Sequence, residues 1–126
     1  MAVRRLFIAN RGEIAVRVIR AARSLGIETV AGVSAADTES MAARLADRAV
    51  TIGPAPAAQS YLDGARIVAA AVGTNCDAIH PGYGFLSENA DFAASVIEAG
   101  LVFVGPTPDN IRAMGNKLEA RRASMP

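Results

Sequence analysis

The stretch IHPGYGFLSEN, residues 79–89, is the part of the sequence that decides the predicted fold. The apolar residues before it indicate a buried strand, which ends at Pro81 because proline has no backbone N–H to donate to a neighbouring strand. Gly82 and Gly84 bracket Tyr83, and glycine allows a positive φ and a close approach to the backbone. The stretch therefore leads from the carboxyl end of a strand to a helix, which is where open α/β sheets bind ligands.

The same loop also has a purely structural interpretation. Connections between strands and helices are often rich in Gly and Pro, and His80, the only histidine, would then be hydrogen-bonded within a tight turn. Ser87 and Glu88 predict the start of the next helix. The apolar face of that helix is expected to carry Phe92, Val96 and Ile97.

The length of 126 residues indicates a single domain that is large enough to bury a core. The composition, with 52% hydrophobic and 20% charged residues, is typical of a globular domain. The net charge of +1 gives no reason to expect nucleic acid or an anionic membrane as a partner. A single cysteine, Cys76, excludes an internal disulfide and is expected to be a buried structural thiol. No run approaches the roughly 20 apolar residues of a membrane helix, so a reducing cytoplasm is the expected compartment.

Five short apolar runs alternate with helical patterns along the chain. The runs lie at residues 6–9, 29–33, 49–52, 76–79 and 101–104. This alternation predicts the α/β class, with a five-stranded, mostly parallel sheet and helices on both faces. The first strand is expected near the centre of the sheet, with the topological switch between the first and fourth strands. That order places residues 10–13 beside residues 80–89.

Capping residues and turn glycines predict where the helices begin and end. Asp37 or Thr38 is expected to cap a short helix through residues 41–45, and Ser60 the following helix. Gly26 suits the left-handed position just after the first helix. The inner face of the helix after Ser60 is expected to carry Leu62, Ala65, Val68, Ala69 and Val72.

The turn after the first strand does not match a dinucleotide site. Such a site needs G-x-G-x-x-G, whereas residues 10–14 contain the single glycine Gly12, and Ser34 stands near the place of the expected acidic residue. An NAD site is therefore disfavoured. The sequence has no G-x-x-x-x-G-K-[ST] phosphate loop, and one His with one Cys cannot form a zinc site.

The basic side chains leave two interpretations open. Arg17, Arg20 and Arg23 share a helix and form either a solvated face or a subunit contact, because arginine is enriched at interfaces. Arg11 follows the first strand at the switch point, where a structural or substrate-facing ion pair is expected. On chemistry alone, Lys117 is a surface residue.

Five motifs together resemble the N-terminal domain of biotin carboxylase. They are ANRGEIAVR at residues 9–17, IGPAP at 52–56, SYL at 60–62, HPGYGFLSEN at 80–89 and MGNK at 114–117. The resemblance covers essentially the whole chain. It implies a Rossmann-like pre-ATP-grasp domain over residues 1–114 and the start of an ATP-grasp domain at 115–126.

The family's activity implies what the loop would do. Biotin carboxylases use MgATP and bicarbonate to carboxylate biotin on a carrier domain. They are components of acetyl-, propionyl- and methylcrotonyl-CoA carboxylases and of pyruvate carboxylase, so the resemblance also implies a role in pathways such as fatty acid biosynthesis. By resemblance, Tyr83 and Gly84 lie beside biotin, in the same loop as His80 and Gly82. The resemblance also implies that Lys117 binds ATP, a role that suits lysine because its ammonium group is a mobile point charge. His80, Glu88 and Asn89 are expected to hold the loop's shape.

The resemblance also implies partners and a division of labour. The biotin carboxyl carrier domain and a carboxyltransferase subunit are the expected partners, and Arg17 and Arg20 resemble the surface of a homodimer. Neither catalytic residues nor metal ligands are expected within these 126 residues, so the chain alone is expected to be inactive. The final acyl acceptor is left open, because the carboxyltransferase selects it.

Some positions depart from the family pattern. Asn116 replaces the usual acid before Lys117, Ser24 replaces an acid late in the first helix, and Ala42 replaces a common histidine. The departures at Asn116 and Ser24 keep one alternative open, a non-catalytic assembly module that retains this domain. Another ATP-grasp carboxylase or ligase is the second alternative.

Overall fold

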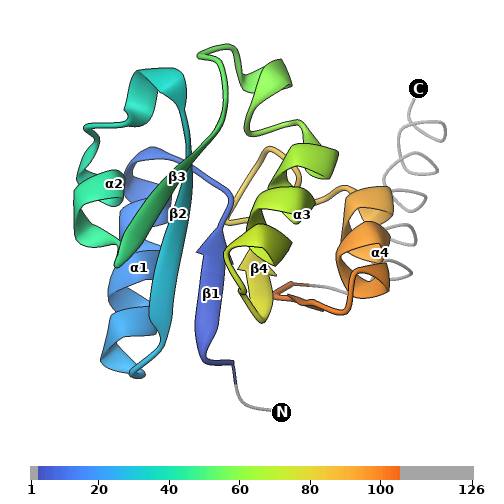
Figure 1. The fold of residues 1–126 in the computed structure, drawn as a ribbon, viewed down its shortest axis with the longest axis horizontal. Helices are drawn as coiled ribbons and strands as arrows, with labels where there is room; N and C mark the ends of the chain where they lie inside the picture. Colours follow the sequence, from blue (N-terminus) through green and yellow to red (C-terminus); the bar gives the residue numbers. More distant parts are fainter. Residues whose placement is uncertain (1–2, 106–126) are drawn as a thin grey trace, which may run out of the picture.

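The computed structural model describes residues 3–105, and its centre is a five-stranded sheet in the order β3-β2-β1-β4-β5 (Figure 1). Every neighbouring pair of strands is parallel. The strands are β1 Arg5–Ile8, β2 Glu28–Ser34, β3 Arg48–Gly53, β4 Ala78–His80 and β5 Val102–Phe103. The central place of β1 and the switch between β1 and β4 confirm the predicted topology.

Helices cover both faces of the sheet, as predicted. They are α1 Gly12–Ser24, α2 Met41–Leu45, α3 Gly64–Gly73 and α4 Ala90–Glu98, with short 3₁₀ turns at Ala35–Asp37 and Ala57–Gln59. Figure 1 shows α1 and α2 on one side of the sheet and α3 and α4 on the other. The two buried clusters follow this division, one formed with α1 and α2 and the other with α3 and α4.

The central strand β1 is apolar throughout because both of its faces are covered. Leu6 and Ile8 pack into the cluster beneath α1, whereas Phe7 packs into the cluster beneath α3 and α4. All three are at most 6% exposed. A continuous apolar run, rather than alternation, is the pattern of a parallel strand buried on both faces.

The helices α2 and α3 begin later than the sequence predicts. Ser40 caps α2, with its hydroxyl accepting a hydrogen bond from the backbone N–H three residues on at 3.2 Å, so the prediction of Asp37 or Thr38 is wrong. Asp63 caps α3 in the same way at 3.2 Å. Ser60 instead lies in the buried turn before α3, where its hydroxyl donates to a backbone carbonyl at 3.0 Å.

The later start of α3 changes which of its sides faces the core. The buried residues are Ile67 and Ala71, whereas Leu62 and Val72, predicted to face inward, are 42% and 51% exposed. Of the other predicted inner residues, Val68 packs partly against the core, and Ala65 and Ala69 face solvent. The prediction used the wrong starting point, so the helical period was right and its phase was wrong.

The helix α4 begins at the end of the loop that connects it to β4. The side chain of Asn89 accepts from a backbone N–H of the first turn at 2.9 Å, so Ser87 and Glu88 precede the helix instead of starting it. Phe92 and Val96 are buried as predicted, but Ile97 is 52% exposed.

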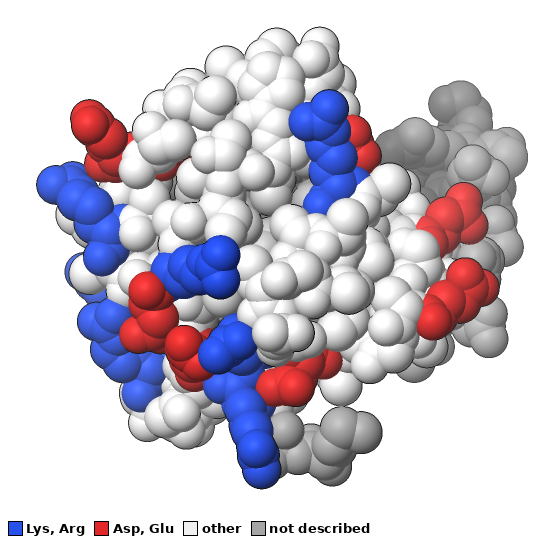
Figure 2. Space-filling view, viewed as in Figure 1, with Lys and Arg blue, Asp and Glu red and all other residues white. Residues whose placement is uncertain are grey.

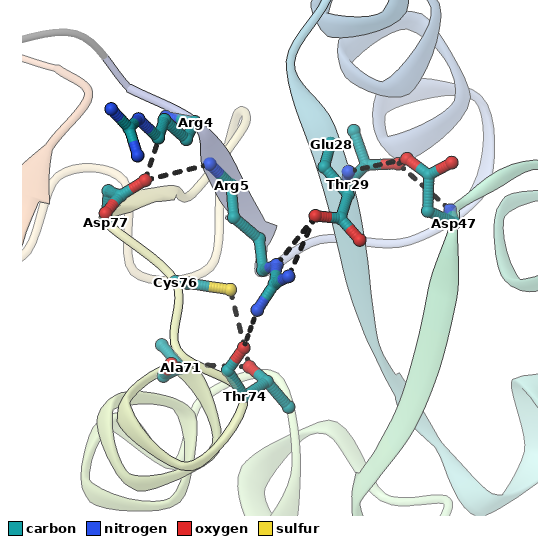
Figure 3. Close-up of polar contacts among 9 residues, drawn as sticks. All are labelled: Arg4, Arg5, Glu28, Thr29, Asp47, Ala71, Thr74, Cys76 and Asp77. Carbon is teal, nitrogen blue, oxygen red and sulfur yellow. Dashed lines mark hydrogen bonds and ion pairs between the residues drawn. The ribbon is translucent and has the colours of Figure 1, made fainter.

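Polar contacts close the amino ends of β1, β2 and β4 (Figure 3). The Asp77 carboxylate accepts the backbone N–H groups of Arg4 and Arg5 at 2.8 and 2.9 Å. The Arg5 guanidinium pairs with Glu28 at 2.9 Å and donates to the carbonyl of Thr74 at 2.8 Å. The strand starts are therefore tied together by charged side chains and backbone groups.

Cys76 lies next to these contacts and is 6% exposed. Burial raises the pKa of its thiol, which lies 3.3 Å from the Thr74 hydroxyl. A raised thiol pKa keeps the nucleophilic thiolate scarce at neutral pH. The expectation of a buried structural thiol is confirmed.

Charged side chains of both signs share the surface. On the face drawn in Figure 2, Lys and Arg lie beside Asp and Glu along the lower and left parts and again at the upper right. Within residues 3–105, no helix combines the length and the hydropathy needed to cross a bilayer.

Candidate functional site

The carboxyl ends of β1, β2 and β4 bring three connections together at one edge of the sheet. Asn10 follows β1, Ser34 ends β2, and His80 ends β4. Residues 80–89, which we call the edge loop, lie against the turn after β1. The predicted juxtaposition of residues 10–13 with this loop is confirmed by the hydrogen bonds of Asn10.

Asn10 holds the edge loop from the β1 side. Its side chain is 2% exposed, and Nδ2 donates to the carbonyls of Pro81 at 2.8 Å and Tyr83 at 2.6 Å. Its Oδ1 accepts the backbone N–H of Arg11 at 2.8 Å. The amide thus uses both donors and an acceptor, which fixes the loop relative to the central strand.

The edge loop turns sharply at its two glycines. Gly82 and Gly84 have φ values of +69° and +66°, in the left-handed region that glycine tolerates. The backbone N–H of Gly82 donates to Nδ1 of His80 at 3.0 Å, so His80 supports the turn as expected. Burial lowers the pKa of His80 and keeps the imidazole neutral. Tyr83 projects from the turn and is 79% exposed.

A second polar group lies on the β2 side of the same edge. The hydroxyl of Tyr61 donates to Oδ2 of Asp37 at 2.6 Å and accepts the backbone N–H of Ser34 at 3.1 Å. The other Asp37 oxygen pairs with Arg11 at 3.1 Å, and the Arg11 guanidinium lies 5.8 Å from the centre of the Tyr61 ring. The ion pair expected at Arg11 is therefore present, with Asp37 as its partner.

The pKa values of this group follow from its contacts. Burial of Tyr61 and its hydrogen bond to Asp37 raise the pKa of the phenol to about 12. Burial also disfavours the Asp37 carboxylate, but the hydrogen bonds from Tyr61 and Ser34 and the charge of Arg11 outweigh it and lower the pKa of Asp37. At neutral pH the pair is a neutral phenol that donates to a carboxylate.

The Tyr61 ring connects this group to the edge loop. It stacks on the ring of Phe85 with centroids 5.3 Å apart and planes at 17°. Phe85 has a φ of +47°, which is unusual for a residue with a side chain. The turn at residues 82–85 is thus held by Asn10 on one side and by Tyr61 on the other.

A groove of about 850 Å³ runs from this turn along α1. His80, Gly82 and Tyr83 line one end, and Ile14 and Arg17 of α1 line its side. Tyr83 therefore stands at the mouth of an accessible hollow.

The comparison with protein families identifies the domain. A family model described as "Biotin carboxylase, N-terminal domain" matches residues 2–111. The chain belongs to this family. It is 58% identical over 119 residues to a biotin carboxylase of Pseudomonas aeruginosa. It is 54% identical over 120 residues to the mitochondrial methylcrotonoyl-CoA carboxylase subunit alpha of Glycine max.

These relatives are much longer than the chain. The alignments cover 94% and 95% of this chain, but 26% of the Pseudomonas protein and 16% of the Glycine max protein. The chain thus spans about a quarter, or less, of the length of these curated relatives.

Solved structures of the family share the fold. The biotin carboxylase subunit of a pyruvate carboxylase superposes with a TM-score of 0.89 at 46% identity, over 96% of this chain and 27% of that one. The biotin carboxylase domain of a thermophilic 2-oxoglutarate carboxylase, bound to bicarbonate, gives 0.90 at 43% identity, over 97% and 27%. The Rossmann-like parallel fold expected from the family resemblance is confirmed.

In this biotin carboxylase domain, the predicted site residues fall into three groups. His80, Gly82, Tyr83 and Gly84 lie together at the carboxyl edge of the sheet. Arg17 and Arg20 are exposed on α1, where Arg17 pairs with Glu13 at 3.2 Å and lines the side of the groove that begins at the edge loop. Lys117 and Asn116 lie outside the described residues, as does the proposed domain boundary at residue 114.

Sequence reasoning missed the part played by Tyr61 and Asp37. The sequence places Tyr61 only within the SYL motif and predicts for Asp37 only a helix cap. The available signal was the rarity of tyrosine, since the chain has two, combined with its place in a loop rich in Pro and Gly. A large aromatic side chain in such a loop usually finds a partner for its hydroxyl when it is buried.

Proposed function

We propose that this domain forms one wall of the biotin-carboxylating site of a biotin carboxylase, which uses ATP and bicarbonate to carboxylate biotin on a carrier domain. The observation that carries the proposal is the edge loop, because Asn10 fixes its backbone while Tyr83 remains 79% exposed at a groove. Family membership supplies the reaction.

The edge loop suits a wall better than a catalytic group. Reactive, activated bicarbonate must be kept from bulk water in a preorganised pocket. A turn held by the buried amide of Asn10 keeps its shape without reorganisation, and Gly84 leaves the space beside Tyr83 open, since a Cβ there would meet no atom within 4 Å. We assign biotin contact to Tyr83 and Gly84, and support of the turn to His80 and Gly82.

We assign ATP and Mg²⁺ mainly to the part of the protein outside residues 3–105. Those described residues contain no group of three or more His, Cys, Asp or Glu that could hold a metal ion. Lys117 is the proposed ATP contact from this chain. The proposed boundary between the N-terminal domain, residues 1–114, and the ATP-grasp domain stays a prediction.

We also propose the assembly that the reaction requires. The carrier domain and a carboxyltransferase subunit are the partners, and the exposed Arg17 and Arg20 of α1 contribute to a homodimer surface. Arginine suits such a surface because its planar guanidinium forms paired hydrogen bonds. We place the protein in the cytoplasm, in an acyl-CoA carboxylase that supplies pathways such as fatty acid biosynthesis.

The experiment is ATP hydrolysis by the full-length protein in bicarbonate, with and without free biotin. We expect stimulation by biotin, and we expect Tyr83→Ala to reduce that stimulation by about ten-fold while the melting temperature stays within about 2 °C, because truncation of an exposed side chain leaves the core intact. Val72→Ala, which truncates an exposed residue of α3, is the matched control. A wild-type protein without biotin stimulation would contradict the proposal.

A further inference from the structure

The turn at residues 82–85 depends on a residue that lies in a different connection of the sheet. Asn10 holds the carbonyl of Tyr83 from the β1 side. On the opposite side, Phe85 stacks on Tyr61, which precedes α3. The exposed Tyr83 and Gly84 stand between these two supports.

The Tyr61 ring is held in one orientation by its hydroxyl. The ring is 1% exposed, and the hydroxyl both donates to Asp37 and accepts from the backbone N–H of Ser34. Ser34 ends β2, and its own hydroxyl donates to Oδ2 of Asp37 at 3.1 Å. The orientation of the ring is therefore set by the end of β2, not by the edge loop.

The conformation of Phe85 shows why the loop needs such a support. A φ of +47° costs free energy for a residue with a Cβ, and it persists only where the surroundings enforce it. The stacked Tyr61 ring, with planes at 17°, favours the placement of the Phe85 ring that goes with this backbone conformation. Loss of the support would let residues 83–85 relax.

We infer that Tyr61 and Asp37 are positioning residues for biotin: the hydrogen bond between them fixes the Tyr61 ring, which fixes Phe85 and thereby the biotin-facing turn at Tyr83 and Gly84. This inference rests on the proposed function for the identity of the ligand. Tyr61 is 1% exposed and acts through Phe85, and Asp37 acts through its hydrogen bond with Tyr61.

The test is steady-state kinetics of the full-length protein with free biotin and ATP as varied substrates. Tyr61→Phe keeps the ring and deletes the hydroxyl. We expect the KM for biotin to rise about five- to ten-fold, because the groups that position biotin are displaced. The KM for ATP and the kcat should stay within about two-fold of the wild-type values. Asp37→Ala should give the same pattern, and the double variant should be no worse than either single one.

Thr74→Val is the matched control, because it also deletes one buried hydroxyl but lies at the opposite edge of the sheet. If the substitutions only lower stability, Tyr61→Phe and Thr74→Val should behave alike. Neither variant should then change the KM for biotin or the KM for ATP. That outcome, or additive effects of Tyr61→Phe and Asp37→Ala, would overturn the inference.

Amide hydrogen exchange of the same proteins separates this inference from the proposed function. Tyr61→Phe should speed exchange within residues 82–89 by about ten-fold and leave β1 unchanged. If the wild type shows no biotin-stimulated hydrolysis, the proposed function fails, and the exchange data alone decide whether Tyr61 positions the turn. Unchanged exchange in the edge loop would reject the positioning role whatever the activity.

Discussion

Gly82 and Gly84 have nearly the same backbone conformation but different surroundings. A Cβ on Gly82 would lie 2.7 Å from Nδ2 of Asn10 and 2.7 Å from a methyl group of Ile14, whereas a Cβ on Gly84 would meet no atom within 4 Å. The first glycine therefore serves close packing as well as conformation. The second serves conformation alone.

This difference predicts unequal effects of alanine. Gly84→Ala should lower the free energy of unfolding by about 1–2 kcal/mol, the cost of a left-handed conformation. Gly82→Ala should lower it by a further amount of about 1–3 kcal/mol, because its Cβ overlaps Asn10 and Ile14. Urea unfolding of the two variants checks the prediction, and equal losses would contradict the close packing of Gly82 against these two side chains.

His80 makes the edge loop sensitive to mild acid. Neutral His80 accepts the Gly82 N–H at Nδ1, and protonation of Nδ1 removes that acceptor. Burial lowers the pKa of His80 below its ordinary 6.5. The unfolded chain therefore binds the proton first, and stability present above pH 6.5 is lost as the pH falls through the folded-state pKa.

The measurement is the urea midpoint between pH 7.5 and 5. The wild type should lose stability in this range, and His80→Gln, which has no group titrating there, should lose less. No other histidine is present, so the difference between the two curves isolates His80. Parallel curves would show that the His80 contact contributes nothing to this pH dependence.

At the scale of elements, the start of α4 controls the exit from the edge loop. Asn89 caps α4 through a 2.9 Å hydrogen bond, and Glu88 is exposed one residue earlier. Asn89→Ala should lower the free energy of unfolding by about 1 kcal/mol. Glu88→Ala, the matched control, should change it by less than about 0.5 kcal/mol. Chemical denaturation distinguishes the two variants. A larger effect at Glu88 would indicate that α4 starts at Ser87 and Glu88, as the sequence predicts, and not after Asn89.

The strand β1 could be predicted from the sequence, whereas the starts of two helices could not. The run at residues 6–9 predicted β1 correctly because a strand buried on both faces leaves a continuous apolar signal. The caps of α3 and α4 were misplaced because several polar residues precede each helix, and any of Ser60, Asp63, Ser87 or Asn89 suits the position. Which of these side chains accepts the first-turn N–H depends on the path of the loop that precedes the helix.

The same contrast applies to the candidate site. The edge loop was predicted because its glycines, proline and histidine are adjacent in sequence. The Tyr61–Asp37 contact spans 24 residues and the Tyr61–Ser34 contact spans 27. Such contacts form only when β2 and the connection before α3 meet at the sheet edge. The sequence around Tyr61 therefore indicates that its hydroxyl needs a partner, but not which residues supply one.

At the scale of the whole molecule, carboxylates with lowered pKa values stabilise both edges of the sheet. Asp37 lies at the carboxyl edge beside Tyr61, and Asp77 lies at the amino edge, where the backbone N–H groups of Arg5 and Arg4 lower its pKa. Glu28 pairs in register with Arg5 at the amino edge, and β2 continues for six residues to Ser34. At about 3.3 Å per residue, the two edges are about 20 Å apart.

This arrangement predicts two independent contributions to acid unfolding. Each carboxylate has a folded-state pKa below its ordinary 3.8, so its contribution is present above pH 3.8 and is lost as the pH falls through the lowered value. Asp37→Asn and Asp77→Asn should each make the loss of stability between about pH 4.5 and 2 shallower, and the double variant should show the sum, because distant sites add. Glu98→Gln, at the exposed end of α4, is the control. A double variant no shallower than one single variant would mean that the two edges unfold as a coupled unit, with the sheet transmitting strain between them.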